Sequence, residues 1–178
     1  MSQRIGEEFS FNKVKSMGNA KFVVVAHGGA GSSNEHADGT EEAVDTCHKA
    51  HQRDTSLVHS VALAVTVLED DGRFNAGSGA HARENGKVEH DAAIMDSNGS
   101  YGAVAVLEGF NNPILVAEAV NETKYRMLAG KGAAEFASDH QLEPTRSHLI
   151  PGAGRDFSTP PTADTVGCVA FDGNTFVA

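Results

Sequence analysis

The spacing of apolar and polar residues predicts a chain that mixes strands and helices. Residues 21–26 (KFVVVA) form a short β-branched run, which is typical of a buried strand. Residues 39–52 and 55–71 instead have the spacing of helices. In the second of these helices, apolar residues recur at intervals of four, four and three, which predicts one buried stripe formed by Leu57, Val61, Val65 and Leu68.

The second half of the chain continues this mixture. Two strand patterns, at residues 87–96 and 101–108, flank Asn98 and Gly99, a dipeptide that favours a tight hairpin turn. The other predicted elements are a structured loop or hairpin at 72–87, a helix at 111–120 with Asn112 as N-cap and Pro113 as first residue, a helix at 130–140, and a final strand pair at 165–171 and 175–178.

Composition limits the classes of function to consider. The chain has 178 residues, of which 40% are hydrophobic and 21% charged, so it is long enough for about one globular domain. Its net charge of −10 repels phosphates, which argues against nucleic acid and anionic membranes as partners. It has neither a secretory signal nor a run of about 20 apolar residues, so we expect a cytoplasmic protein. Cys47 and Cys168 lack a C-x-x-C spacing and are predicted to be reduced, semi-buried thiols.

Three features that could carry chemistry do not complete a motif. The glycine-rich turn HGGAGSS, residues 27–33, lacks the Gly-Lys-Ser/Thr ending of a phosphate loop. His48 and His51 could share a helix face, but no further ligand completes a zinc site. The consecutive acids at 69–71 would point in different directions from a helix end, which makes them unconvincing as an acid–base pair.

A threonine stands where a polar, proline-rich segment changes into a strand. Residues 141–163 carry four of the five prolines, as an exposed linker does, and the strand pattern begins directly after the Asp164–Thr165 bond. A threonine hydroxyl within a chain has no built-in base. If that bond were cleaved, the new α-amino group, with a pKa of about 7.7–8.0, could act as the base for the hydroxyl of the same residue. A β-branched residue that simply begins a strand is the alternative interpretation.

Three further segments carry a resemblance. They are VVVAHGGAG at 23–31, LEDDGRFNAGSGAHARENGKVEHDAAIMD with YGAVAVLEGFNNPILVAEAV at 68–96 and 101–120, and DTVGCVAFDGN at 164–174. In order and nearly in spacing they resemble the isoaspartyl peptidase/plant-type L-asparaginase family of N-terminal-nucleophile hydrolases. The resemblance covers about residues 21–178, and the long middle segment is more specific than either glycine turn.

The resemblance implies an αββα four-layer sandwich, incomplete in this chain, that cuts itself into an α and a β subunit. It implies an amidohydrolase whose Thr165 attacks the side-chain amide of L-asparagine or the β-carbonyl of an isoaspartyl dipeptide and releases L-aspartate. The implied partners are a small β-aspartyl substrate, the remainder of the β subunit, and a second αβ unit in a dimer. The implied division is an N-terminal extension at 1–20, an α-subunit part at 21–140, an exposed linker at 141–164 and the start of the β subunit at 165–178.

Site residues follow from the same resemblance. Asn75 would lie beside Thr165 and help to position it, and His27, Gly28 and Gly29 of the HGGAG turn would take part in self-cleavage between Asp164 and Thr165. No organic cofactor is implied. A structural sodium ion is implied, since family loops of this kind hold one through main-chain carbonyls, which suit a hard cation. These would be the carbonyls of Leu68, Glu69, Asp71, Phe74, Ala76 and Ser78.

Departures from the family pattern leave other interpretations open. Family members continue into a T-S-T-G-G segment, an Arg and an Asp that grip the substrate, and a T-G-x-G turn, whereas this sequence ends at Ala178. We therefore expect a fragment, a truncated product or one piece of a divided protein, inactive by itself. Asp164 also stands where many relatives have Gly. The alternatives are a glycosylasparaginase or taspase-like member of the superfamily, or a non-catalytic remnant that only binds a small molecule or a partner chain.

Overall fold

The structure is a computed structural model that describes residues 22–144 and 165–178. Within these ranges the chain is mixed α/β, as the sequence predicts. The strands are β1 (Val23–His27), β2 (His90–Met95), β3 (Tyr101–Leu107), β4 (Met127–Ala129), β5 (Gly167–Phe171) and β6 (Phe176–Val177). The α-helices are α1 (Ala37–His51), α2 (Leu57–Asp70), α3 (Pro113–Asn121) and α4 (Gly130–Asp139), with short 3-10 turns η1 (Asn34–His36) and η2 (Gly77–Gly79).

The strands form two small sheets that meet at β6. One sheet has the order β1-β5-β6, with antiparallel pairs throughout, and the other has the order β2-β3-β4, with β4 parallel to β3. Met95 at the end of β2 and Ala178 after β6 exchange both backbone hydrogen bonds, at 2.8 and 2.9 Å. Because this exchange is an antiparallel pairing, the short strand β6 joins the two sheets, and residues of both β5 and β2 line one open groove.

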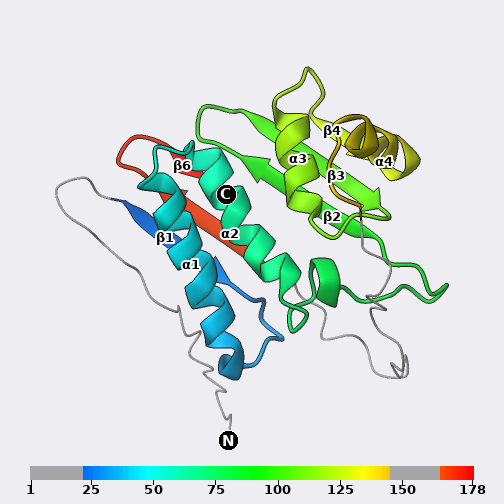
Figure 1. Cartoon of the computed structure of the whole chain (residues 1–178), viewed down its shortest axis with the longest axis horizontal. Coiled ribbons are helices and arrows are strands. Elements are labelled where there is room, and N and C mark those ends of the chain that lie inside the picture. Colours follow the sequence, from blue (N-terminus) through cyan, green and yellow to red (C-terminus); the bar gives the residue numbers. More distant parts are fainter. Residues whose placement is uncertain (1–21, 145–164) are drawn as a thin grey trace, which may run out of the picture.

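The helices cover one face of these sheets, as Figure 1 shows for α1, α2 and α3. Helices α1 and α2 pack on the sheet that holds β1 and β5, through a cluster that includes Val24, Leu68 and Ala170. Helices α3 and α4 pack on β3 through a second cluster that includes Val104 and Ala133. The opposite face is open, because large apolar side chains on it are about half exposed: Met95, Met127, Val169 and Phe176.

Most predicted elements are confirmed. The stripe Leu57, Val61, Val65 and Leu68 is buried, and Asn98-Gly99 joins β2 to β3 with Gly99 at a φ of 85°. The first helix begins two residues earlier than predicted. Strand β4 was not predicted, because three residues between two helices leave no periodic pattern. The two cysteines are free thiols, as predicted, and are fully buried rather than semi-buried.

Two of the sequence predictions concern residues outside the described ranges. The extension at 1–20 and all but residues 141–144 of the linker lie there, including Asp164. In the part of the chain that the structure describes, no helix is both long enough and apolar enough to cross a membrane.

Candidate active site

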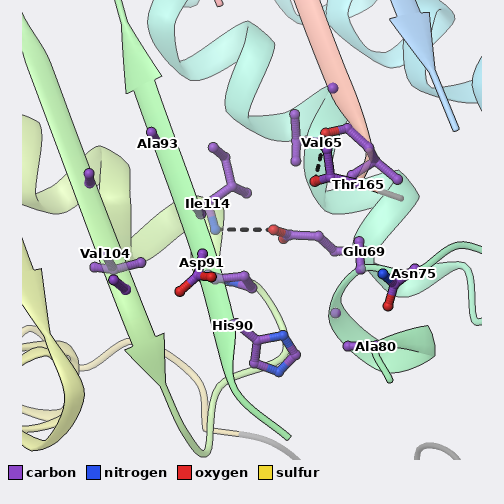
Figure 2. A pocket seen from close by; sticks show the side chains of 18 of the residues that line it. Val65, Glu69, Asn75, Ala80, His90, Asp91, Ala93, Val104, Ile114 and Thr165 are labelled. Carbon is purple, nitrogen blue, oxygen red and sulfur yellow. Dashed lines mark hydrogen bonds between the residues drawn. The ribbon is translucent and has the colours of Figure 1, made fainter. Parts of the chain in front are cut away.

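An open groove of about 1660 Å³ brings residues of all three family-like segments to one place. It is lined by His27 from the end of β1, Asn75 from the loop after α2, and Thr165 from the residues just before β5. Figure 2 shows Thr165 and Asn75 on one side of the groove in this view, with His90 and Asp91 of β2 across from them. The sequence predicted the first three of these as site residues, and the fold places them around a common space.

Thr165 is exposed at the amino end of β5. The predicted alternation is confirmed after it, since Cys168 and Ala170 are buried whereas Val169 is 46% exposed. The Thr165 hydroxyl donates a hydrogen bond of 3.4 Å to the Val166 carbonyl. A bond of that length is weak, so the hydroxyl is not firmly held by its own chain.

Asn75 is held by its own loop. Its side-chain oxygen accepts the backbone N–H of His81, six residues further along the chain, at 3.0 Å. This bond closes the loop around η2. This bond fixes the orientation of the Asn75 amide at the wall of the groove. The side chain is therefore preorganised by the loop that carries it, as a positioning role requires.

Phe74 anchors the same loop between two glycines. Its ring is 2% exposed and meets the His36 imidazole edge-on, with the centroids 5.9 Å apart. A Cβ atom at Gly28 would overlap the Phe74 ring, and one at Gly39 would lie 2.8 Å from it. Gly28 belongs to the HGGAG turn and Gly39 to the first turn of α1, so Phe74 ties both segments to the loop that carries Asn75.

His27 makes the corresponding contact with the third segment. It pairs with Gly167 across the β1–β5 ladder, and a Cβ atom at Gly167 would overlap the His27 ring. Gly167, two residues after Thr165, thus leaves room for the imidazole. No sequence signal pairs these two residues, because the contact depends on the register of strands that are far apart in the chain.

An arginine clamps the loop to α1. The Arg73 guanidinium forms a two-bond contact with Asp38, both bonds at 2.9 Å, and also binds Asp71. The guanidinium lowers the pKa of both Asp38 and Asp71. The acids at 69–71 were predicted to point in different directions, and two of them do: Asp71 binds Arg73, whereas Glu69 is buried.

Glu69 carries a carboxyl group yet is buried, with only 2% of its surface exposed. Its carboxyl group accepts the backbone N–H of Ile114 at 3.1 Å and the side-chain amide of Asn112 at 3.3 Å. Burial raises the pKa of Glu69 to about 8, and these two donors oppose that rise. Glu69 thus caps the amino end of α3 from another helix, while Asn112 stands at the N-cap position without a capping bond of its own.

Main-chain carbonyl groups lie at the end of α2, where the resemblance implies a sodium site. In an α-helix the last four carbonyls have no intrahelical partner, and they form the negative end of the helix dipole. The hydroxyl of Ser78 bonds the carbonyls of Glu69 (2.8 Å) and Asp70 (3.2 Å), so the loop folds back over the helix end. A Cβ atom at Gly79 would meet the carbonyls of Phe74 and Gly72, so these two oxygens lie close to Gly79.

The donor chemistry of this loop fits a hard monovalent cation. Of the six carbonyls that the resemblance implies, that of Glu69 accepts the Ser78 hydroxyl and that of Phe74 lies against Gly79. Two others accept backbone bonds within the loop, Asp71 from Phe74 and Ala76 from Gly79, and each carbonyl oxygen keeps a second lone pair. Among residues 22–144 and 165–178, no cluster of three or more His, Cys, Asp or Glu side chains could hold a metal.

His90 and Asp91 were not predicted as site residues. His90 is 7% exposed, and burial lowers the pKa of its imidazole while Asp91 opposes that shift. The Asp91 carboxylate accepts the N–H of Val106 at 2.8 Å, where a β-bulge gives this β-branched residue a φ of 54°. The bulge puts Leu107, instead of Val106, into the core beside Val104.

The features set aside from the sequence have structural roles. The rings of His48 and His51 pack against Phe22, with centroids 5.7 and 4.4 Å away. These contacts favour ordinary helix residues over zinc ligands. Gly29 in the HGGAG turn has a φ of 95°, which explains a glycine there without any phosphate.

Comparisons with known proteins identify relatives of this chain. A family model described as asparaginase matches residues 20–155. The mouse isoaspartyl peptidase/L-asparaginase is 36% identical over 182 residues, which cover 89% of this chain and 56% of the mouse protein. The plant-type L-asparaginase of Pyrococcus abyssi is 35% identical over 187 residues (88% of this chain, 61% of that protein), and the bovine isoaspartyl peptidase/L-asparaginase is 42% identical over 139 residues (73% and 43%).

The family match covers most of the sequence, and the chain therefore belongs to this asparaginase family. The resemblance noted in the sequence is confirmed. The chain spans about half the length of the curated relatives that it matches.

Proposed function

We propose that this chain carries the nucleophile of a threonine amidohydrolase that releases L-aspartate from isoaspartyl dipeptides and L-asparagine. The observation that carries the proposal is the shared groove of His27, Asn75 and Thr165, which come from three segments far apart in the sequence. The names of the relatives, isoaspartyl peptidase/L-asparaginase and plant-type L-asparaginase, favour this activity over a glycosylasparaginase or taspase-like one.

The chemistry begins with cleavage of the Asp164–Thr165 bond, which frees the α-amino group of Thr165. That amine takes the proton of Oγ1 while Oγ1 attacks the β-carbonyl of the substrate. The leaving amine, which is ammonia from asparagine or an amino acid from the dipeptide, departs with a proton, and a β-aspartyl ester remains on Thr165. Water then hydrolyses the ester to L-aspartate. Both substrates give the same ester, so one pocket can serve both.

The fold that we propose for the whole enzyme is the αββα sandwich. Two features support it: helices cover a single face of the described sheets, and the other face presents half-exposed Met95, Met127, Val169 and Phe176. A second sheet packed on that face would bury these side chains. The remainder of the β subunit is the partner that would supply it, so that residues 21–140 act as the α part and residues 165–178 begin the β part.

Further parts of the proposal rest on the family pattern. The carbonyls at the end of α2 would hold a structural sodium ion, whose role is to fix the loop that carries Asn75. We also propose a dimer of αβ units and a cytoplasmic location. A non-catalytic remnant remains the second candidate, because the matched relatives are about twice as long as the region they share with this chain.

The proposal is tested in a longer polypeptide that adds, from a relative, the part of the relatives' length that this chain does not span. We expect it to release aspartate from an isoaspartyl dipeptide and to leave the α-aspartyl isomer intact. Thr165→Ala should reduce release to background, and Thr165→Ser should retain slow turnover, because it keeps the hydroxyl but loses the methyl that restricts χ1. Thr175→Ala, in the turn before β6, is the matched control and should behave as the wild type. Equal rates for Thr165→Ala and the control would favour the remnant.

A further inference from the structure

The contact between His27 and Gly167 has a consequence for Thr165. Residues alternate between the two faces of a strand, so Thr165 and Gly167 belong to one face, and Val166, Cys168 and Ala170 belong to the other, which faces the helices. Two residues of strand span about 6.6 Å. Because Gly167 has no side chain, nothing from β5 separates the His27 ring from the neighbourhood of Thr165.

Backbone conformation does not explain the glycine at this position. Gly167 does not have a left-handed φ, unlike Gly29 or Gly173, so alanine could adopt its backbone geometry without strain. Glycine inside a strand costs stability, about 0.5–1 kcal/mol relative to alanine. What the glycine does provide is room: a Cβ atom would overlap the Nε2 end of the imidazole and lie 3.1 Å from its Cδ2.

We propose that His27 is a positioning residue for Thr165, and that Gly167 is a glycine so that the His27 ring can lie over the strand beside the nucleophile. The ring limits the orientations open to Thr165. This inference rests on the proposed function, because it concerns the same nucleophile, and it adds Gly167 to the residues on which that function depends.

The alternative is that the ring merely fills the space above a glycine, as aromatic side chains do in many sheets. The two roles predict opposite results for Gly167→Ala. His27 is exposed, so its ring can rotate away from a new methyl group, and the fold should survive the substitution. If the ring only fills space, its displacement should leave the reaction rate unchanged. If the ring positions Thr165, its displacement should lower the rate.

The experiment uses the longer, self-cleaving polypeptide. We expect Gly167→Ala to melt no lower than the wild type, yet to cleave itself and turn over an isoaspartyl dipeptide about 10- to 100-fold more slowly, with the loss in kcat and not in KM. His27→Ala should show a similar loss, and the double variant should be no slower than His27→Ala, since both changes remove one contact. His27→Phe, which keeps a flat ring, should recover most of the rate.

Gly132→Ala is the matched control, because an added Cβ there meets open space and its φ is also not left-handed. It should leave every rate unchanged. If Gly167→Ala is as fast as the wild type, or if its melting temperature falls together with its activity, the positioning role is wrong. The positioning role would also be wrong if the double variant's fold-loss in rate equalled the product of the fold-losses of the two single variants. A wild type that does not cleave would instead contradict the proposed function, and this inference with it.

Discussion

At the scale of single residues, the contacts of Phe74 and His27 explain why glycines stand where they do. Gly28 and Gly39 leave room for the Phe74 ring, and Gly167 leaves room for the His27 ring. In each case a ring from one segment fits over a glycine of another. Each of these glycines therefore packs against one particular ring. The contact between His27 and Gly167 joins segments that lie more than a hundred residues apart in the sequence.

Phe74→Ala should destabilise the chain strongly. The substitution removes a 2%-exposed ring from between two glycines whose backbones cannot fill the space, so a cavity remains. Buried phenylalanines typically contribute about 3–5 kcal/mol to the free energy of unfolding. Urea unfolding measures the change, with Phe176→Ala as the control, because Phe176 is 54% exposed. Similar losses for the two variants would mean that Phe74 does not anchor the loop.

His90 should make stability depend on pH. Burial lowers the pKa of His90 in the folded state, so the unfolded state binds a proton first as the pH falls. The stability associated with a neutral His90 is therefore present above about pH 6.5 and is lost as the pH falls through the lower folded-state pKa. His90→Gln should flatten the fall in unfolding free energy between pH 7.5 and 5.5. Identical pH profiles for the two proteins would show that His90 is not shielded from water.

At the scale of elements, the helix ends show which features a sequence pattern can predict and which it cannot. The pattern predicted α3 with Pro113 as its first residue, and that prediction is confirmed. It could not predict that Glu69 of α2 caps α3, because a cap supplied by another helix leaves no local signal. Strand β4 was missed for a similar reason, since its three residues are held by pairing with β3.

Glu69→Ala should cost about 1–3 kcal/mol, because the buried N–H of Ile114 loses its acceptor. Glu69→Gln should cost much less at pH 7, since the amide oxygen can accept the same bond and burial, which raises the pKa of Glu69, already disfavours its charged form. Chemical unfolding compares the two, with Glu135→Ala, on the exposed face of α4, as the control. Equal costs for alanine and glutamine would argue against the cap.

The loop after α2 should respond to sodium. An ion that binds only the folded state raises the melting temperature as its concentration increases. The chain should therefore melt higher in sodium chloride than in the chloride of a bulky organic cation at the same ionic strength. Coincident melting curves would count against a carbonyl cage at the end of α2.

The candidate site was predictable in part. Asn75, His27 and Thr165 could be named because short segments around them resemble a family, and the structure places all three at one groove. Gly167, Arg73 and His90 could not, since their roles depend on which strands and loops become neighbours. Asp164 lies outside the described residues, so the predicted cleavage bond is still a prediction.

At the scale of the whole molecule, the described sheets are covered by helices on one face and open on the other. The groove is lined by residues of both β5 and β2, which belong to the two sheets that β6 joins. Both features fit a chain that holds the α part and the first strands of the β part of a larger sandwich. The central claim is that Thr165 becomes the first residue of that β part.

The intact mass of the longer polypeptide tests this claim most directly, together with N-terminal sequencing of its fragments. We predict two fragments, of which the second begins with Thr165, and a single uncut species for Thr165→Ala. The cut needs no added protease. The Thr165 hydroxyl attacks the carbonyl carbon of Asp164, the peptide C–N bond breaks as the acyl group moves to Oγ1 and the α-amino group is freed, and water then hydrolyses this ester to give the two fragments. A second fragment that begins at any other residue, or cleavage that persists in Thr165→Ala, would contradict the mechanism.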